Sequence, residues 1–82
     1  MSLMENLVKY NNAFKQCFSV SDEQLNGNLT YQSIPGWDSV GHMQLIAFLE
    51  ECFAITMETE DIIEFSSYEK GKTILRKYGV VI

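Results

Sequence analysis

Hydrophobic and polar residues alternate at helical spacing near the start of the chain. The pattern predicts a first helix from about Glu5 to Phe18, with polar residues such as Lys9 and Asn12 on its other side. The apolar positions of this helix are Leu7, Tyr10, Phe14, Cys17 and Phe18. One face of the helix should therefore pack against the rest of the protein.

Helical spacing is lost between Ser19 and Trp37. This stretch contains turn-forming sequences, among them Asn26-Gly27-Asn28 and Ile34-Pro35-Gly36, which predict a long loop. A loop of this length is unusual in a small domain unless apolar side chains hold it against the core. The candidates for this anchoring are Val20, Leu25, Leu29, Tyr31 and Ile34.

A second helix is expected to begin at Asp38 or Ser39 and to end near Phe53. Pro35 and Gly36 prevent an earlier start, and Asp38 is a favourable N-cap because its charge suits the positive end of the helix dipole. Gly41 is expected to weaken this helix by up to about 1 kcal/mol relative to alanine.

Two further helices are predicted in the last part of the chain. A short one covers Thr59 to Glu64, where acids surround two isoleucines. For the last helix, Ser66 and Glu69 are expected to form a capping box, and Gly79 ends it. Its apolar positions are Tyr68, Ile74, Leu75 and Tyr78. The fold expected is all-α: a small four-helix bundle with three main helices, one short helix and a long first loop.

The second helix carries two apolar stripes. The broad stripe is the expected core face and consists of Leu45, Ile46, Leu49, Cys52 and Phe53. The narrow stripe lies on the same side as Ser39 and consists of Val40, Met43 and Ala47, edged by Gln44, Glu50 and Glu51. An apolar strip with a charged edge is typical of a docking face for a basic partner. Alternatively, a bundle this small buries both stripes.

Charge is distributed unevenly along the 82 residues, whose formal net charge is −5. All basic residues lie near the two ends, and ten of the eleven acids lie between Lys15 and Lys70. Such a surface repels nucleic acid and attracts basic proteins. The spacing of Cys17 and Cys52 indicates neither a metal site nor a disulfide framework, so both are expected to be small buried hydrophobic residues.

The sequence shows no apolar run of membrane-spanning length and no secretory signal, so we expect a cytoplasmic protein without membrane contact. Met1-Ser2-Leu3 precede a second methionine and are expected to be a cloning remnant, which leaves a single domain over 4–82. We also expect a monomer.

The segment Gly36-Trp37-Asp38-Ser39-Val40, followed by His42-Met43-Gln44-Leu45-Ile46 and Leu49-Glu50-Glu51-Cys52-Phe53, resembles the attachment helix of acyl carrier proteins. Valine stands here where the usual Asp-Ser-Leu motif of that family has leucine. The resemblance extends over nearly the whole chain, from the first helix and long loop to the short acidic helix and the last helix.

The resemblance implies that Ser39 receives 4′-phosphopantetheine from coenzyme A and that Asp38 belongs to the attachment site. Cargo would be held as a thioester on the terminal thiol of this arm. The implied partners are a phosphopantetheinyl transferase and acyl-loading and acyl-using enzymes with basic docking surfaces. Gly41 and Gln44 stand where many fatty-acid carriers have acids, which favours a specialised pathway over bulk fatty acid synthesis.

Two other functions remain open from the residues alone. The protein could be an unmodified acidic interaction module that uses the same face. It could also be a minimal enzyme, because His42 stands one helical turn after Ser39. The chain lacks a Gly-x-Ser-x-Gly elbow and is too small for a substrate cleft, so we expect no enzymatic activity and a packing role for His42. Trp37 is expected to pack the loop onto the bundle.

Overall fold

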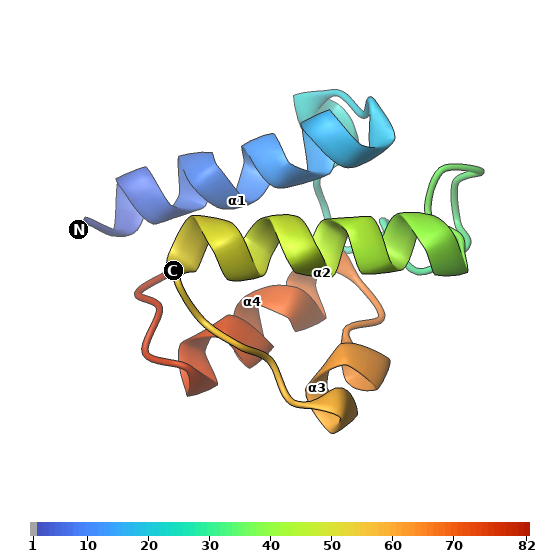
Figure 1. The fold of residues 1–82 in the computed structure, drawn as a ribbon. Coiled ribbons are helices and arrows are strands. Elements are labelled where there is room, and N and C mark those ends of the chain that lie inside the picture. The colour runs from blue at the N-terminus through green and yellow to red at the C-terminus, as the bar shows by residue number, and fades with distance from the viewer. Residues whose placement is uncertain (1) are drawn as a thin grey trace.

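The computed structural model describes residues 2–82 and contains helices and loops, with no strand in this range. The elements are α1 (Leu3–Phe18), the short 3-10 helix η1 (Asp22–Gln24), α2 (Ser39–Phe53), α3 (Thr59–Glu64) and α4 (Tyr68–Lys77). Helices α1 and α2 lie side by side and run in opposite directions (Figure 1). Helix α4 packs against α1 through Tyr68, whose ring centroid lies 5.3 Å from that of Tyr10. The predicted small all-α bundle is confirmed.

Helix α1 begins earlier than the predicted Glu5. The hydroxyl of Ser2 accepts a hydrogen bond from the N–H of Glu5 at 3.2 Å and caps the helix, which starts at Leu3. An N-cap serine satisfies one of the N–H groups that the first turn leaves open. Ser2 and Leu3, expected to lie outside the fold, thus take part in its first helix. The helix ends as predicted at Phe18.

Aromatic rings fill the centre of the bundle. The ring of Phe14 lies 5.0 Å from that of Tyr10, 5.5 Å from that of Trp37 and 5.3 Å from that of Tyr68, all between ring centroids. These three pairs are edge-on or nearly so, a favourable geometry for aromatic side chains. Trp37 has no exposed surface and also stacks on Phe18, so it anchors the loop to the bundle as expected.

The long loop is held by side chains and by backbone hydrogen bonds. Val20 and Leu29 are buried and Leu25 and Ile34 half-buried, as predicted, whereas Tyr31 is exposed. Two backbone bonds tie the loop to the start of α4: the N–H of Tyr31 donates to Ser66 O at 2.8 Å, and the N–H of Tyr68 donates to Leu29 O at 2.9 Å. The loop is therefore a fixed part of the fold.

The cap of α4 is Ser67, so the predicted capping box of Ser66 and Glu69 is wrong. The side chain of Ser67 accepts from the N–H of Lys70 at 2.9 Å. Ser66 precedes the cap, and its carbonyl group is bonded to the loop at Tyr31. The long-range pairing with the loop thus fixes which of the two serines caps the helix.

Helix α3, confirmed over Thr59–Glu64, is attached to the end of α4 through a buried carboxylate. Asp61 accepts hydrogen bonds from Lys77 Nζ at 2.6 Å and from the hydroxyl of Tyr78 at 2.5 Å. The pKa of Asp61 is lowered below its ordinary value of 3.8. The hydrogen bond from Lys77 is the largest cause, and the bond from Tyr78 is the second. The hydroxyl of Tyr78 also accepts from the N–H of Glu58 at 2.9 Å, so it fixes the start of α3 as well.

Candidate functional site

Ser39 is the first residue of α2, and its side chain is exposed. The preceding Asp38 is the N-cap: its Oδ1 accepts from the N–H of Gly41 at 2.8 Å, and its carbonyl accepts from the N–H of His42 at 2.8 Å. These bonds satisfy the third and fourth N–H groups of the helix and leave those of Ser39 and Val40 at its positive end. Asp38 therefore fixes the start of α2, from which the side chain of Ser39 projects.

Gly41 allows the loop to pass directly against the first turn of α2. A Cβ atom at this position would lie 2.0 Å from the carbonyl oxygen of Gly36 and 3.1 Å from Cε1 of Phe18. Backbone atoms cannot yield as a flexible side chain can, so alanine does not fit here. The structure therefore gives Gly41 a role beyond its expected cost in helix propensity: the absent side chain lets the carbonyl of Gly36 lie against the first turn of α2.

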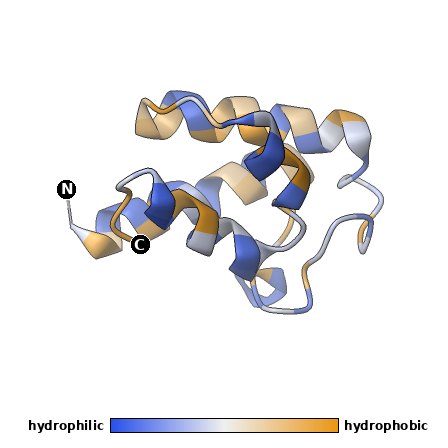
Figure 2. Cartoon of the chain, turned by 90° about the horizontal axis from the view of Figure 1, so that it is seen from below, coloured by the Kyte–Doolittle hydropathy of each residue, from blue (hydrophilic) through white to orange (hydrophobic). Residues whose placement is uncertain are grey.

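The two apolar stripes of α2 have different surroundings. In the broad stripe Leu45, Ile46 and Leu49 are buried, whereas Cys52 and Phe53 are half-buried. In the narrow stripe Val40 is 65% and Met43 52% exposed, and Ala47 is exposed as well. Hydrophobic residues occur along the whole of α2 (Figure 2). The alternative in which both stripes are buried is therefore wrong.

The polar edge of the narrow stripe is less uniform than the sequence suggested. Gln44 and Glu51 are exposed. Glu50 is half-buried, and its Oε2 accepts from the N–H of Met57 at 2.8 Å, so this carboxylate holds the segment that follows α2. A substitution of Glu50 would therefore affect the fold as well as any docking.

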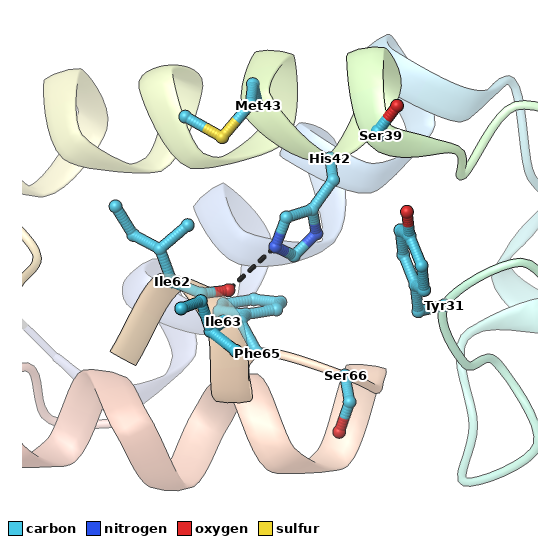
Figure 3. Close-up of a pocket in the computed structure, with 8 residues that line it drawn as sticks. All are labelled: Tyr31, Ser39, His42, Met43, Ile62, Ile63, Phe65 and Ser66. Atoms are coloured by element: carbon cyan, nitrogen blue, oxygen red, sulfur yellow. Dashed lines mark hydrogen bonds between the residues drawn. The ribbon is translucent and has the colours of Figure 1, made fainter. Parts of the chain in front are cut away.

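A hollow of about 360 Å³ opens next to Ser39, between α2, α3 and the loop. Its lining is mainly apolar and consists of Tyr31, Ser39, His42, Met43, Ile62, Ile63, Phe65 and Ser66 (Figure 3). The contributions of α3 and of Tyr31 have no signal in the sequence around Ser39, because only the fold brings these distant segments together. Ile63, which is 74% exposed, continues the apolar surface on the α3 side of the hollow.

His42 extends from α2 into the hollow, between Tyr31 on one side and Ile62 and Phe65 on the other (Figure 3). Its Nδ1 accepts from the indole N–H of Trp37 at 3.0 Å, and its Nε2 lies 2.8 Å from the carbonyl oxygen of Ile62. Both ring nitrogens are thus engaged within the fold. In this arrangement neither is available to take a proton from Ser39, and the expected packing role of His42 agrees with these contacts.

The cysteines differ from the expectation that both are buried. Cys17 and Cys52 are half-buried free thiols, and partial burial is the main cause that raises the pKa of each. Over residues 2–82, no three His, Cys, Asp or Glu side chains are grouped so that they could hold a metal ion. Within the same range, no helix has both the length and the apolar character needed to cross a membrane.

The site therefore consists of an exposed serine at a helix start, an apolar hollow beside it and an exposed apolar stripe along the same helix. Comparison with protein-family models and with curated proteins finds no match to this sequence.

Proposed function

We propose that the protein is an acyl carrier protein that holds its cargo on 4′-phosphopantetheine attached to Ser39. The observation that carries the proposal is the place of Ser39: an exposed hydroxyl at the first position of α2 that borders an apolar hollow. The motif of Asp38, Ser39 and Val40 on the second helix of a small acidic bundle supports the same function.

The residues around Ser39 fit a phosphopantetheine group. The N–H groups of Ser39 and Val40 point out of the helix start, where a phosphodiester's negative charge is favoured. The charge of Asp38 opposes this attraction, although its hydrogen bond to Gly41 directs one carboxylate oxygen into the helix. When bound, the group supplies a flexible arm whose terminal thiol carries the cargo as a thioester. The apolar hollow offers this arm a surface to lie on.

Attachment requires little of the chain itself. The hydroxyl oxygen of Ser39 forms a bond to the phosphorus that bears the pantetheine arm in coenzyme A, the phosphoanhydride bond breaks, and the adenosine bisphosphate part leaves. The hydroxyl proton must be removed by the transferase, since both ring nitrogens of His42 are engaged elsewhere. Ser39 must be accessible and correctly oriented, which Asp38 and Gly41 provide through the helix start.

The narrow stripe is the docking face in this proposal. Val40, Met43 and Ala47 would contact the transferase and the loading enzymes, while Gln44 and Glu51 form the exposed polar edge. Glu50 belongs to the proposed edge through its position, but its main contact is with Met57. Partners with basic residues around an apolar patch fit this surface. The proposal also includes a monomeric carrier in the cytoplasm that serves a specialised pathway.

The direct test is modification of the unmodified protein. It is incubated with coenzyme A and a broad-specificity phosphopantetheinyl transferase, and the intact mass and the modified peptide are measured. Wild type should gain one phosphopantetheine on Ser39, and Ser39→Ala should gain none. Ser66→Ala is the matched control, because Ser66 is exposed and lines the same hollow. It should be modified like wild type.

Failure to gain mass with several different transferases would reject the carrier function and favour the unmodified interaction module. The minimal enzyme is tested separately by ester hydrolysis. We expect none in wild type or in His42→Gln, because His42 is held by Trp37 and Ile62. Hydrolysis that both Ser39→Ala and His42→Gln abolish would favour the enzyme instead.

A further inference from the structure

The chain contains one histidine and one tryptophan, and the two are hydrogen-bonded to each other next to Ser39. Trp37 lies two positions before Ser39 and His42 one helical turn after it. The rings of Trp37 and His42 are nearly parallel, at an interplanar angle of 16°. Tyr31 and Phe65 meet the imidazole edge-on, at 5.5 and 6.0 Å between centroids. The imidazole ring of His42 is therefore packed among three aromatic rings.

The hydrogen bonds of His42 fix its protonation state. An indole N–H can only donate, so Nδ1 of His42 must accept and carries no proton. The proton is then on Nε2, which donates to the carbonyl oxygen of Ile62. The ring is neutral in this arrangement. A proton added to Nδ1 would place two N–H groups opposite each other at 3.0 Å, and the ring and Trp37 would have to separate.

Separation has a direct effect on the segment before Ser39. Trp37 has no exposed surface, so its indole N–H would be left buried without its acceptor, which is costly. The carbonyl of Gly36, next to Trp37, is in close contact with the first turn of α2 at Gly41. A shift of Trp37 is therefore transmitted to the residues that orient Ser39. The bond to Ile62 is compatible with either protonation state, since Nε2 donates in both.

We propose that His42 is a positioning residue for Ser39: its neutral ring holds Trp37 in place, and protonation of Nδ1 releases Trp37 and slows modification of Ser39. This inference rests on the proposed carrier function for its effect on modification, but the release of Trp37 does not depend on it. Imidazole ordinarily changes charge between about pH 5 and 8, unlike carboxylates and phenols. Acidification through this range is therefore the condition under which the release is tested.

Other titratable groups lie on the elements around His42. They are Tyr31 of the loop, Asp38 at the start of α2, and Glu60, Asp61 and Glu64 of α3. Asp38 is bonded to the N–H of Gly41, and Asp61 to Lys77 and Tyr78. Protonation of a carboxylate on these elements is the competing explanation for a change on acidification, so the test needs a variant that removes only the titration of His42.

His42→Gln is that variant. A glutamine amide can accept from Trp37 through its oxygen and donate to Ile62 through its nitrogen, and it takes up no proton between pH 5 and 8, a range in which imidazole titrates. His42→Phe keeps a ring packed at this position and removes both hydrogen bonds. If His42→Phe does not fold, the comparison of wild type with His42→Gln still decides the matter.

The experiment follows the indole N–H resonance and the fluorescence of Trp37, together with the ring protons of His42, on the unmodified protein from about pH 8 to 5. In wild type, the Trp37 signals should change with the same midpoint as His42. In His42→Gln they should stay constant. Titration of His42 without a change at Trp37, or an equal change in His42→Gln, would overturn the proposal.

Modification rates provide the second readout. The rate for wild type divided by that for His42→Gln, at the same pH and with the same transferase, cancels the transferase's own pH dependence. This ratio should fall several-fold over the pH range in which the ring-proton signals of His42 show that it gains its proton. A constant ratio would contradict the positioning role. If neither protein is modified at any pH, the carrier function fails, while the Trp37 signals still test the release.

Discussion

Replacing Gly41 with alanine has two opposite effects on stability: a gain in helix propensity and a steric clash with the loop. In an open helix, alanine in place of glycine stabilises by up to about 1 kcal/mol. Here the new Cβ would lie 2.0 Å from the carbonyl oxygen of Gly36. To reach an ordinary contact, the loop or the helix must move by more than 1 Å, and the loop carries the fully buried Trp37.

Overpacking of a tight site costs about 1–3 kcal/mol, and the upper part of that range applies because the obstacle is backbone. After subtraction of the gain in helix propensity, we expect Gly41→Ala to lower the free energy of unfolding by about 1–2 kcal/mol. This corresponds to a fall in the thermal midpoint of roughly 4–16 °C for a domain of this size.

Urea unfolding followed by the fluorescence of Trp37 measures the effect directly. Gly27→Ala is the matched control, because a Cβ at Gly27 would be 3.9 Å from Cγ of Glu69, an ordinary contact. Its stability should stay within about 0.5 kcal/mol of wild type. An unchanged or higher stability of Gly41→Ala would refute the reasoning, since it would show that the loop does not need this glycine.

Two further predictions concern the surface of α2 and the attachment of α3. Met43→Ala should change the free energy of unfolding by less than about 0.5 kcal/mol and slow modification of Ser39. Leu45→Ala, which empties a fully buried site, should lower the free energy of unfolding by about 2–5 kcal/mol in urea unfolding. Equal losses in the two variants would show that Met43 belongs to the core. Because hydrogen bonds from Lys77 and Tyr78 lower the pKa of Asp61, its carboxylate should contribute stability above the ordinary value of 3.8 that disappears as the pH falls. Asp61→Asn should therefore flatten the acid limb of the stability curve measured by urea midpoints, and an unchanged slope would mean that the pairing contributes nothing.

Local patterns in the sequence predicted most of the helical fold. The spacing of Tyr10 and Phe14, the turn signals before Asp38 and the acids around Ile62 each depend on neighbours along the chain, and the corresponding helices formed where expected. The sequence also contains a local signal for η1, since Ser21 and Gln24 form a capping box at its start. The cap of α4 was misassigned because the choice between adjacent serines depends on a distant contact.

The surroundings of Ser39 were predicted only in part, for the same physical reason. Helical periodicity places Met43 outside the broad stripe of α2, but its exposure follows only from the packed fold, because a small bundle could bury both stripes. The hollow depends on Tyr31 and Ile63, which reach Ser39 only after the loop and α3 have packed. The partners of His42 and the role of Gly41 likewise depend on contacts across the fold, which have no local pattern in the sequence.

The two ends of the described chain lie together, at the end of the bundle farthest from Ser39 (Figure 1). Asn6 Nδ2 donates to the carbonyl oxygen of Val81 at 2.8 Å, which joins the two end segments. Ser39 lies at the opposite end of α2, about 20 Å away, because each residue of the helix adds about 1.5 Å along its axis. A linker, fluorophore or solid support fixed at either end would therefore leave Ser39 facing outward, so the protein can be tethered without blocking its candidate attachment site.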